Sequence, residues 1–120
     1  MAFIFPDAPT LASNTPNYWW QSIAKALDPV YAMMRQPISR TMDTNMGQAI
    51  DTVLHATTQA HMSSMPARLQ AQLIAALINM QPSLSARQAG ERRQSAKYWR
   101  MAQVEWTLFE EMLAREGIQR

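Results

Sequence analysis

The two histidines carry the most versatile side chains in this sequence, because an imidazole binds metal ions and transfers protons near neutral pH. His55 and His61 are six residues apart, which turns them about 120° from each other on a helix. Helical metal sites place two histidines four residues apart on one face, so this pair does not bind one ion in that way. Asp51 lies four residues before His55, and that spacing favours a surface Asp–His pair over a general base.

The motifs of catalysis and cofactor binding are missing from the sequence. There is no cysteine, which excludes disulfides, thiol catalysis and sulfur-ligated zinc or iron. With three glycines in the chain there is no glycine-rich phosphate loop, and no serine-nucleophile or zinc-protease motif occurs. We therefore expect no catalytic residues, no cofactor and no metal, and a protein that is not an enzyme.

A cluster of basic residues precedes the aromatic end of the chain. The segment from Arg87 to Arg100 holds five basic side chains and one acidic side chain. On a helix, Arg93, Lys97 and Arg100 fall within about 60° of one another and form a basic stripe. These three residues are candidate phosphate contacts in a nucleic-acid interface. A solvated helix face is the alternative interpretation.

The segment from Tyr98 to Leu113 has more apolar surface than one core requires. Its apolar residues cover about 220° of a helical wheel, whereas a helix that packs on one core needs a little over 100°. Trp99, Trp106 and Leu113 recur every seven residues along one edge of this arc, as in a coiled-coil seam. Either the arc lies at the centre of a small bundle, or one edge is reserved for a second chain.

The first sixteen residues do not have a helical pattern. They contain three prolines, each of which lacks an N–H and disfavours helix in the residue before it. Phe3 and Phe5 are nevertheless costly to leave in water. Residues 1–15 are therefore predicted to be an extended arm that docks either on its own body or on a neighbouring subunit, and 16–120 to be one helical domain.

Membrane contact is a third, less favoured hypothesis. Trp19 and Trp20 form a pair near the start of the first expected helix, and tryptophan is enriched at membrane interfaces. The polar face of that helix is nearly uncharged, which matches a basic membrane-surface helix poorly.

Apolar spacing predicts an all-α fold of three to four helices with no strand. A long C-terminal helix over 84–116 would measure about 50 Å, against about 35 Å for a compact globule of this size. Either Gly90 breaks this helix, or the protein is elongated and packs against another molecule. Proline positions suggest the ends of the other helices, which are expected over 16–27 with a restart over 29–35, over 41–61, and over 66–80 with a break at 81–83.

Length and composition indicate one domain made in the cytoplasm. The chain has 120 residues, of which 48% are hydrophobic, and a net charge of +2, so a core is attainable without disulfides or metals. The first basic residue is Lys25, so no charged segment of a signal peptide is present. Polar residues and prolines interrupt every apolar run before the length of a transmembrane span.

These features favour a non-enzymatic structural or assembly subunit that forms a homo- or hetero-oligomer. Ten methionines add adaptable side chains for partner surfaces. The candidate interface residues are Phe3, Phe5, Trp19, Trp20, Trp99, Trp106, Phe109 and Leu113. A cysteine-free helical body with an extended arm resembles small structural proteins of bacteriophage particles, which implies a virion connector, internal core or ejected protein. The alternative function is a small helical nucleic-acid-binding or regulatory protein that uses the basic residues from Arg87 to Arg100.

Overall fold

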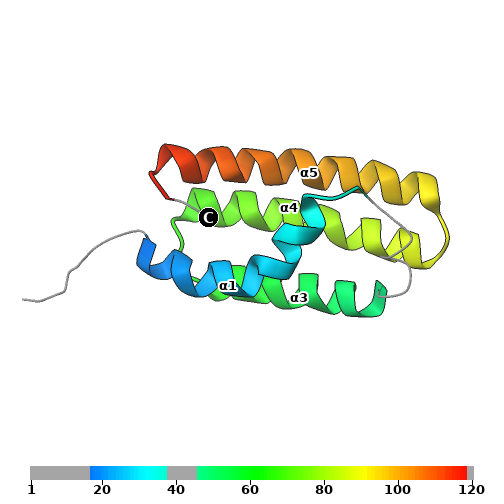
Figure 1. Ribbon diagram of the computed structural model, residues 1–120, viewed down its shortest axis with the longest axis horizontal. Coiled ribbons are helices and arrows are strands. Elements are labelled where there is room, and N and C mark those ends of the chain that lie inside the picture. The colour runs from blue at the N-terminus through cyan, green and yellow to red at the C-terminus, as the bar shows by residue number, and fades with distance from the viewer. Residues whose placement is uncertain (1–16, 38–45, 119–120) are drawn as a thin grey trace, which may run out of the picture.

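The computed structural model describes residues 17–37 and 46–118, and these residues form helices without any strand. The all-α prediction is therefore confirmed for this part of the chain. The predicted arm, with Phe3 and Phe5, lies outside the described residues. The helices, labelled as in Figure 1, are α1 (Asn17–Met34), α3 (Met46–Met62), α4 (Ala67–Gln88) and α5 (Arg92–Arg115).

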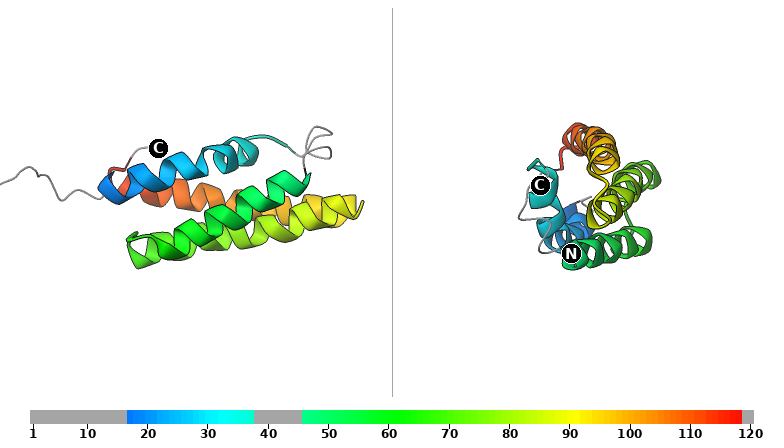
Figure 2. Two further views of the ribbon diagram at one scale, coloured as in Figure 1. Left: turned by 90° about the horizontal axis from the view of Figure 1, so that it is seen from below. Right: turned by 90° about the vertical axis from the view of Figure 1, so that its right-hand side faces the viewer.

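The four described helices form an antiparallel bundle. Each helix runs opposite to the one that precedes it among the described elements (Figure 1). The end-on view shows the helices around a common centre, in the order α1, α3, α4 and α5 (Figure 2). Fully buried side chains from all four helices fill this centre, among them Leu27, Val53, Leu73 and Phe109. Burying each of these side chains contributes about 1.5–3 kcal/mol.

The predicted break at 81–83 is wrong, because α4 continues through Pro82 to Gln88. A proline inside a helix removes the hydrogen bond that this position would give to the Ile78 carbonyl, at a cost of about 3 kcal/mol. Ser83 and Leu84, which follow the proline, are buried at 0% and 1% exposure. Packing of the turn after Pro82 offsets the lost bond, and the helix therefore persists.

The long helix predicted over 84–116 is instead divided at Gly90. This residue has φ +80°, a left-handed conformation that favours glycine. The Glu91 N–H donates to the Ala86 carbonyl at 2.8 Å and the Gly90 N–H donates to the Arg87 carbonyl at 3.0 Å, which is the Schellman end of a helix. The 24 residues of α5 extend about 36 Å. This length matches the diameter of about 35 Å expected for a compact globule of this size, so α5 does not need to pack against another molecule.

The predicted restart of the first helix at Pro29 is also wrong. Helix α1 contains Pro29 in its interior, and the ribbon changes direction along the helix (Figure 1). Leu27 and Val30, on either side of the proline, are fully buried. Core packing on both sides of Pro29 therefore holds α1 together as one helix.

Candidate functional site

The seam of Trp99, Trp106 and Leu113 lies in the intramolecular core rather than on an edge open to a second chain. Each of the three residues is only 3% exposed. Part of the cover comes from α1 and the residues that follow it. The rings of Tyr31 and Trp106 are 5.8 Å apart, and Trp99 Nε1 donates to the Gln36 carbonyl. The rings of Trp20 and Phe109, next to the seam, are 5.7 Å apart. Trp20 is itself buried. Of the other candidate interface residues, the side chain of Trp19 lies outside the described side chains, as do Phe3 and Phe5.

The opposite edge of the apolar arc on α5 is the exposed one. Met101, Val104 and Leu108 are 43%, 60% and 42% exposed. Their spacing of three and four residues places them in one row along the helix, which we call the outer row. Two residues of the row also line a shallow groove of about 400 Å³, whose lining residues are Arg100, Gln103, Val104, Thr107 and Leu108. The sequence-based interface prediction missed this row, although the excess width of the apolar arc indicated that one edge would be left over.

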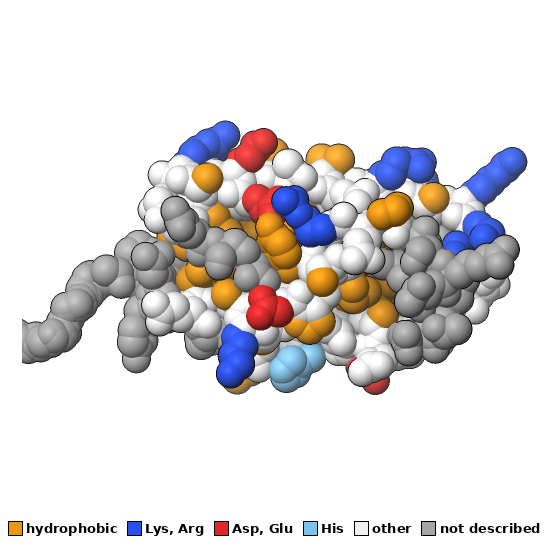
Figure 3. Space-filling model, in the orientation of Figure 1, with side chains coloured by type: hydrophobic (Ala, Val, Ile, Leu, Met, Phe, Trp, Pro, Cys, Tyr) orange, Lys and Arg blue, Asp and Glu red, His pale blue; other side chains and the backbone are white. Residues whose placement is uncertain are grey.

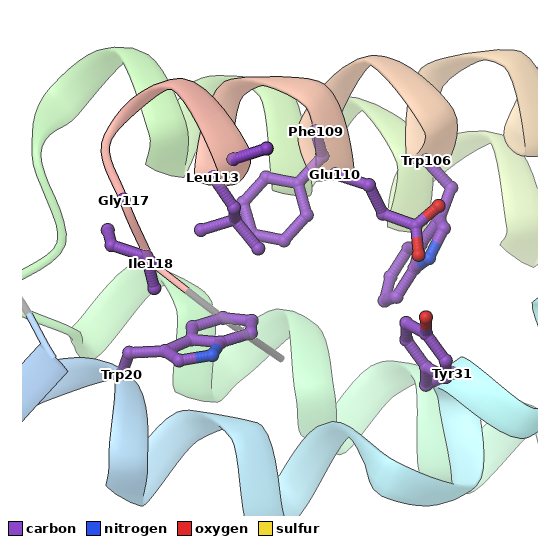
Figure 4. A pocket seen from close by; sticks show the side chains of 9 residues that line it. Trp20, Tyr31, Trp106, Phe109, Glu110, Leu113, Gly117 and Ile118 are labelled. Atoms are coloured by element: carbon purple, nitrogen blue, oxygen red, sulfur yellow. The ribbon is translucent and has the colours of Figure 1, made fainter.

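A second hollow lies between α1 and α5. This pocket has a volume of about 360 Å³. Figure 4 shows Trp20 and Tyr31 reaching into it from α1, and Trp106, Phe109 and Leu113 from α5. The full set of residues that define this aromatic pocket is Trp20, Tyr31, Trp106, Phe109, Glu110, Leu113, Ala114, Gly117 and Ile118.

The end of α5 closes one side of the aromatic pocket. Gly117 has φ +75°, and the Ile118 N–H donates to the Leu113 carbonyl at 2.9 Å. This Schellman turn brings the residue after the glycine back onto the last turn of the helix. Ile118 is therefore buried beside Leu113, and both residues line the pocket.

A charged pair lies at the other side of the pocket. Arg35 Nη1 donates to Glu110 Oε1 at 3.2 Å. The same guanidinium lies 5.3 Å from the centre of the Tyr31 ring, at the distance of a cation–π contact. Figure 3 shows hydrophobic side chains between α5 and α1, with acidic and basic side chains among them. Arg35 thus connects the two helices that bound the pocket.

The indole nitrogens of Trp99 and Trp106 differ in their surroundings. Trp99 Nε1 donates to the Gln36 carbonyl at 3.2 Å. Trp106 Nε1 is buried, and it has no hydrogen-bond partner within the described part of the chain. An unsatisfied buried donor costs about 1–3 kcal/mol. Trp106, one of the residues that line the aromatic pocket, therefore carries a buried polar group without an acceptor in the described residues.

The basic stripe is on the surface. Arg93, Lys97 and Arg100 are all exposed on α5, and Lys97 Nζ lies 5.9 Å from the centre of the Tyr98 ring. Basic side chains gather over the beginning of α5, at the right of Figure 3. The three predicted phosphate contacts are therefore on one accessible helix face.

The histidines are not assembled into a site in the described part of the chain. His55, His61 and Asp51 are exposed on α3. The described residues contain no group of three or more His, Cys, Asp or Glu side chains that could hold a metal ion. None of the described helices has the length and apolar character to cross a membrane. Comparisons with protein-family models, with curated proteins and with solved structures gave no match.

Proposed function

We propose that this chain is a non-enzymatic structural subunit that assembles through the outer row of α5. The observation that carries the proposal is the exposure of Met101, Val104 and Leu108 on successive turns. None of the three residues belongs to the hydrophobic core of the bundle. A contiguous apolar surface on a folded protein marks an interaction site more often than a single exposed residue does, and a row at this spacing suits a partner helix.

The charges at the ends of the outer row favour a second copy of the same chain as the partner. Exposed Lys97 precedes the row and exposed Glu111 follows it, which extends the alternating spacing of four and three residues found in coiled-coil seams. In an antiparallel pair related by a two-fold axis at Val104, Lys97 of each copy faces Glu111 of the other. Such a symmetric contact is the commonest form of homodimer interface.

Light scattering of the full chain over a range of concentrations tests this proposal. We expect a dimer that Val104→Lys converts to a monomer, because the substitution places a charge at the centre of the seam. Leu54→Lys is the matched control, since Leu54 is an apolar residue of α3 with 46% exposure; it should leave the dimer intact. A monomer at every concentration, or equal effects of the two variants, contradicts self-pairing.

Charge reversal tests the antiparallel register. Lys97→Glu and Glu111→Lys should each weaken the dimer, because each places like charges opposite one another. The double variant should restore association. Additive weakening in the double variant contradicts the proposed facing of Lys97 and Glu111.

The finer proposal is that the assembly is a bacteriophage particle, in which this chain is a connector, an internal core protein or an ejected protein. Its support is the resemblance in composition, a cysteine-free helical body preceded by a proline-containing apolar arm. Mass spectrometry of purified particles tests it: the chain should be present in a fixed number of copies per particle. Its absence from every purified particle contradicts the proposal.

The second candidate function is nucleic-acid binding through the basic stripe. Arg92 and Arg93 occupy the first turn of α5, where no acidic residue is present. Positive charge at a helix N-terminus opposes the helix dipole, so these residues do not stabilise α5 and are available to a phosphate. Binding to DNA that falls steeply between low and moderate salt, and that Lys97→Gln and Arg100→Gln reduce, supports this function. Salt-independent or undetectable binding contradicts it.

A further inference from the structure

The aromatic pocket between α1 and α5 has the properties of a binding site for an apolar ligand that offers one hydrogen-bond acceptor. Its volume of about 360 Å³ lies in the range of ligand pockets, about 300–1,000 Å³. Trp20, Phe109 and Leu113 supply apolar walls. Trp106 Nε1 supplies a buried donor without a partner in the described residues. An occupant that suits this lining combines apolar groups with an acceptor such as a carbonyl.

We propose that the occupant is the start of this same chain, Phe3-Ile4-Phe5, bound within one molecule. In an extended segment, alternate side chains point to the same side, so Phe3 and Phe5 face the pocket together and Ile4 faces away. The backbone of an extended segment has free carbonyls, and one of them accepts from Trp106 Nε1. Phe3 and Phe5 leave water in the same step.

The connection to α1 makes the intramolecular arrangement favourable. Helix α1 begins at Asn17, and Trp20, one turn later, lines the pocket. The connecting residues 6–16 can span about 36 Å when extended, which is far more than the return to the first turn of α1 requires. Because the segment and the pocket belong to one chain, the effective concentration of the segment at the pocket is in the range of short linkers, about millimolar. Docking within the chain therefore prevails over docking of a second copy in dilute solution.

This inference does not rest on pairing through the outer row, since the pocket and the row involve different residues. An experiment on dilute full-length protein therefore separates the two. The cysteine-free sequence allows one nitroxide label to be attached through Ala2→Cys. The indole N–H signals of the tryptophans, observed by NMR, report how close the label comes.

The expected result is a larger loss of signal at Trp20 and Trp106 than at Trp99, whose indole bonds to Gln36 outside the pocket. Adding Phe3→Ala and Phe5→Ala to the labelled protein should restore the signals. Adding Ile4→Ala should not, because this side chain faces away. Circular dichroism confirms that each variant keeps its helical content.

Two results would overturn the proposal. The first is an equal effect at all three tryptophans, or one that persists after both phenylalanines are removed. The second comes from a mixture of isotope-labelled protein without nitroxide and nitroxide-labelled protein without isotope. If the loss of signal in that mixture equals the loss in the protein that carries both isotope and nitroxide, the arm of another molecule occupies the pocket.

Discussion

The hydroxyl of Ser83 donates a hydrogen bond to the backbone carbonyl of Ser95 at 2.7 Å. Both side chains are completely buried, and their hydroxyl oxygens are 3.4 Å apart. The two serines lie on either side of the Gly90 turn, so the contact joins α4 to α5 near the place where the chain reverses.

Ser83→Ala should destabilise the bundle by about 1–2 kcal/mol, because a buried hydrogen bond is lost while the polar carbonyl stays behind. Urea unfolding monitored by circular dichroism measures the change. Ser85→Ala is the control, since Ser85 is exposed on the same helix, and it should change stability by less than about 0.5 kcal/mol. Equal losses from the two variants would show that the buried contact contributes nothing specific.

Gly90→Ala and Gly47→Ala should have effects of opposite sign. A Cβ at either position meets no atom within 4 Å, so the backbone conformation alone decides the outcome. Alanine in the left-handed conformation of Gly90 costs about 1–2 kcal/mol. Alanine at Gly47, in the first turn of α3, gains less than the value of about 1 kcal/mol that helix propensity gives in a helix interior. Thermal unfolding of both variants checks the prediction, and a Gly90→Ala protein as stable as the parent contradicts the assigned turn.

Pro82→Ala should stabilise the protein by up to about 3 kcal/mol, because alanine restores the hydrogen bond that proline cannot give. The matched variant is Pro66→Ala, at the position that precedes α4, where no helical bond is lost and a small change is expected. Denaturant midpoints measure both. If Pro82→Ala leaves stability unchanged, α4 does not pass through this residue as a continuous helix.

Gln103→Ala should loosen the last turn of α1. The Gln103 amide donates to the Met34 carbonyl at 3.2 Å, and this carbonyl lies at the helix end, where carbonyls lack a helical donor. Loss of the bond should cost about 1 kcal/mol and speed amide hydrogen exchange at Arg35 and Gln36. Gln94→Ala, at an exposed position of the same helix, is the control and should leave exchange in α1 unchanged.

Local rules applied to the sequence predicted the helical class correctly but placed helix ends poorly. From the sequence alone, Pro29 and Pro82 predict breaks, because proline costs a hydrogen bond wherever it stands in a helix interior. That rule cannot include the burial of Val30 or Leu84, which depends on helices elsewhere in the chain. Gly90 was identified as a candidate break, and the structure places the turn there.

The candidate site was harder to predict, because a helical wheel shows how wide an apolar arc is but not which part is covered. Trp106 and Val104 both belong to the arc of α5. The first is buried, with the Tyr31 ring of α1 5.8 Å away, and the second is 60% exposed, because the other helices cover only part of the arc. Nothing in the local sequence of α5 specifies where α1 will lie. The aromatic pocket was missed for the same reason, since it exists only between those two helices.

The contact between Trp20 and Phe109 has a consequence for the synthesis of the chain. Trp20 leaves the ribosome early and Phe109 leaves it near the end of synthesis, because translation proceeds from the N-terminus. Trp20 and Tyr31 therefore emerge long before Trp106 and Phe109 can cover them. During translation the growing chain exposes aromatic surface that only the last helix removes, and a truncation before Trp106 would leave that surface open permanently.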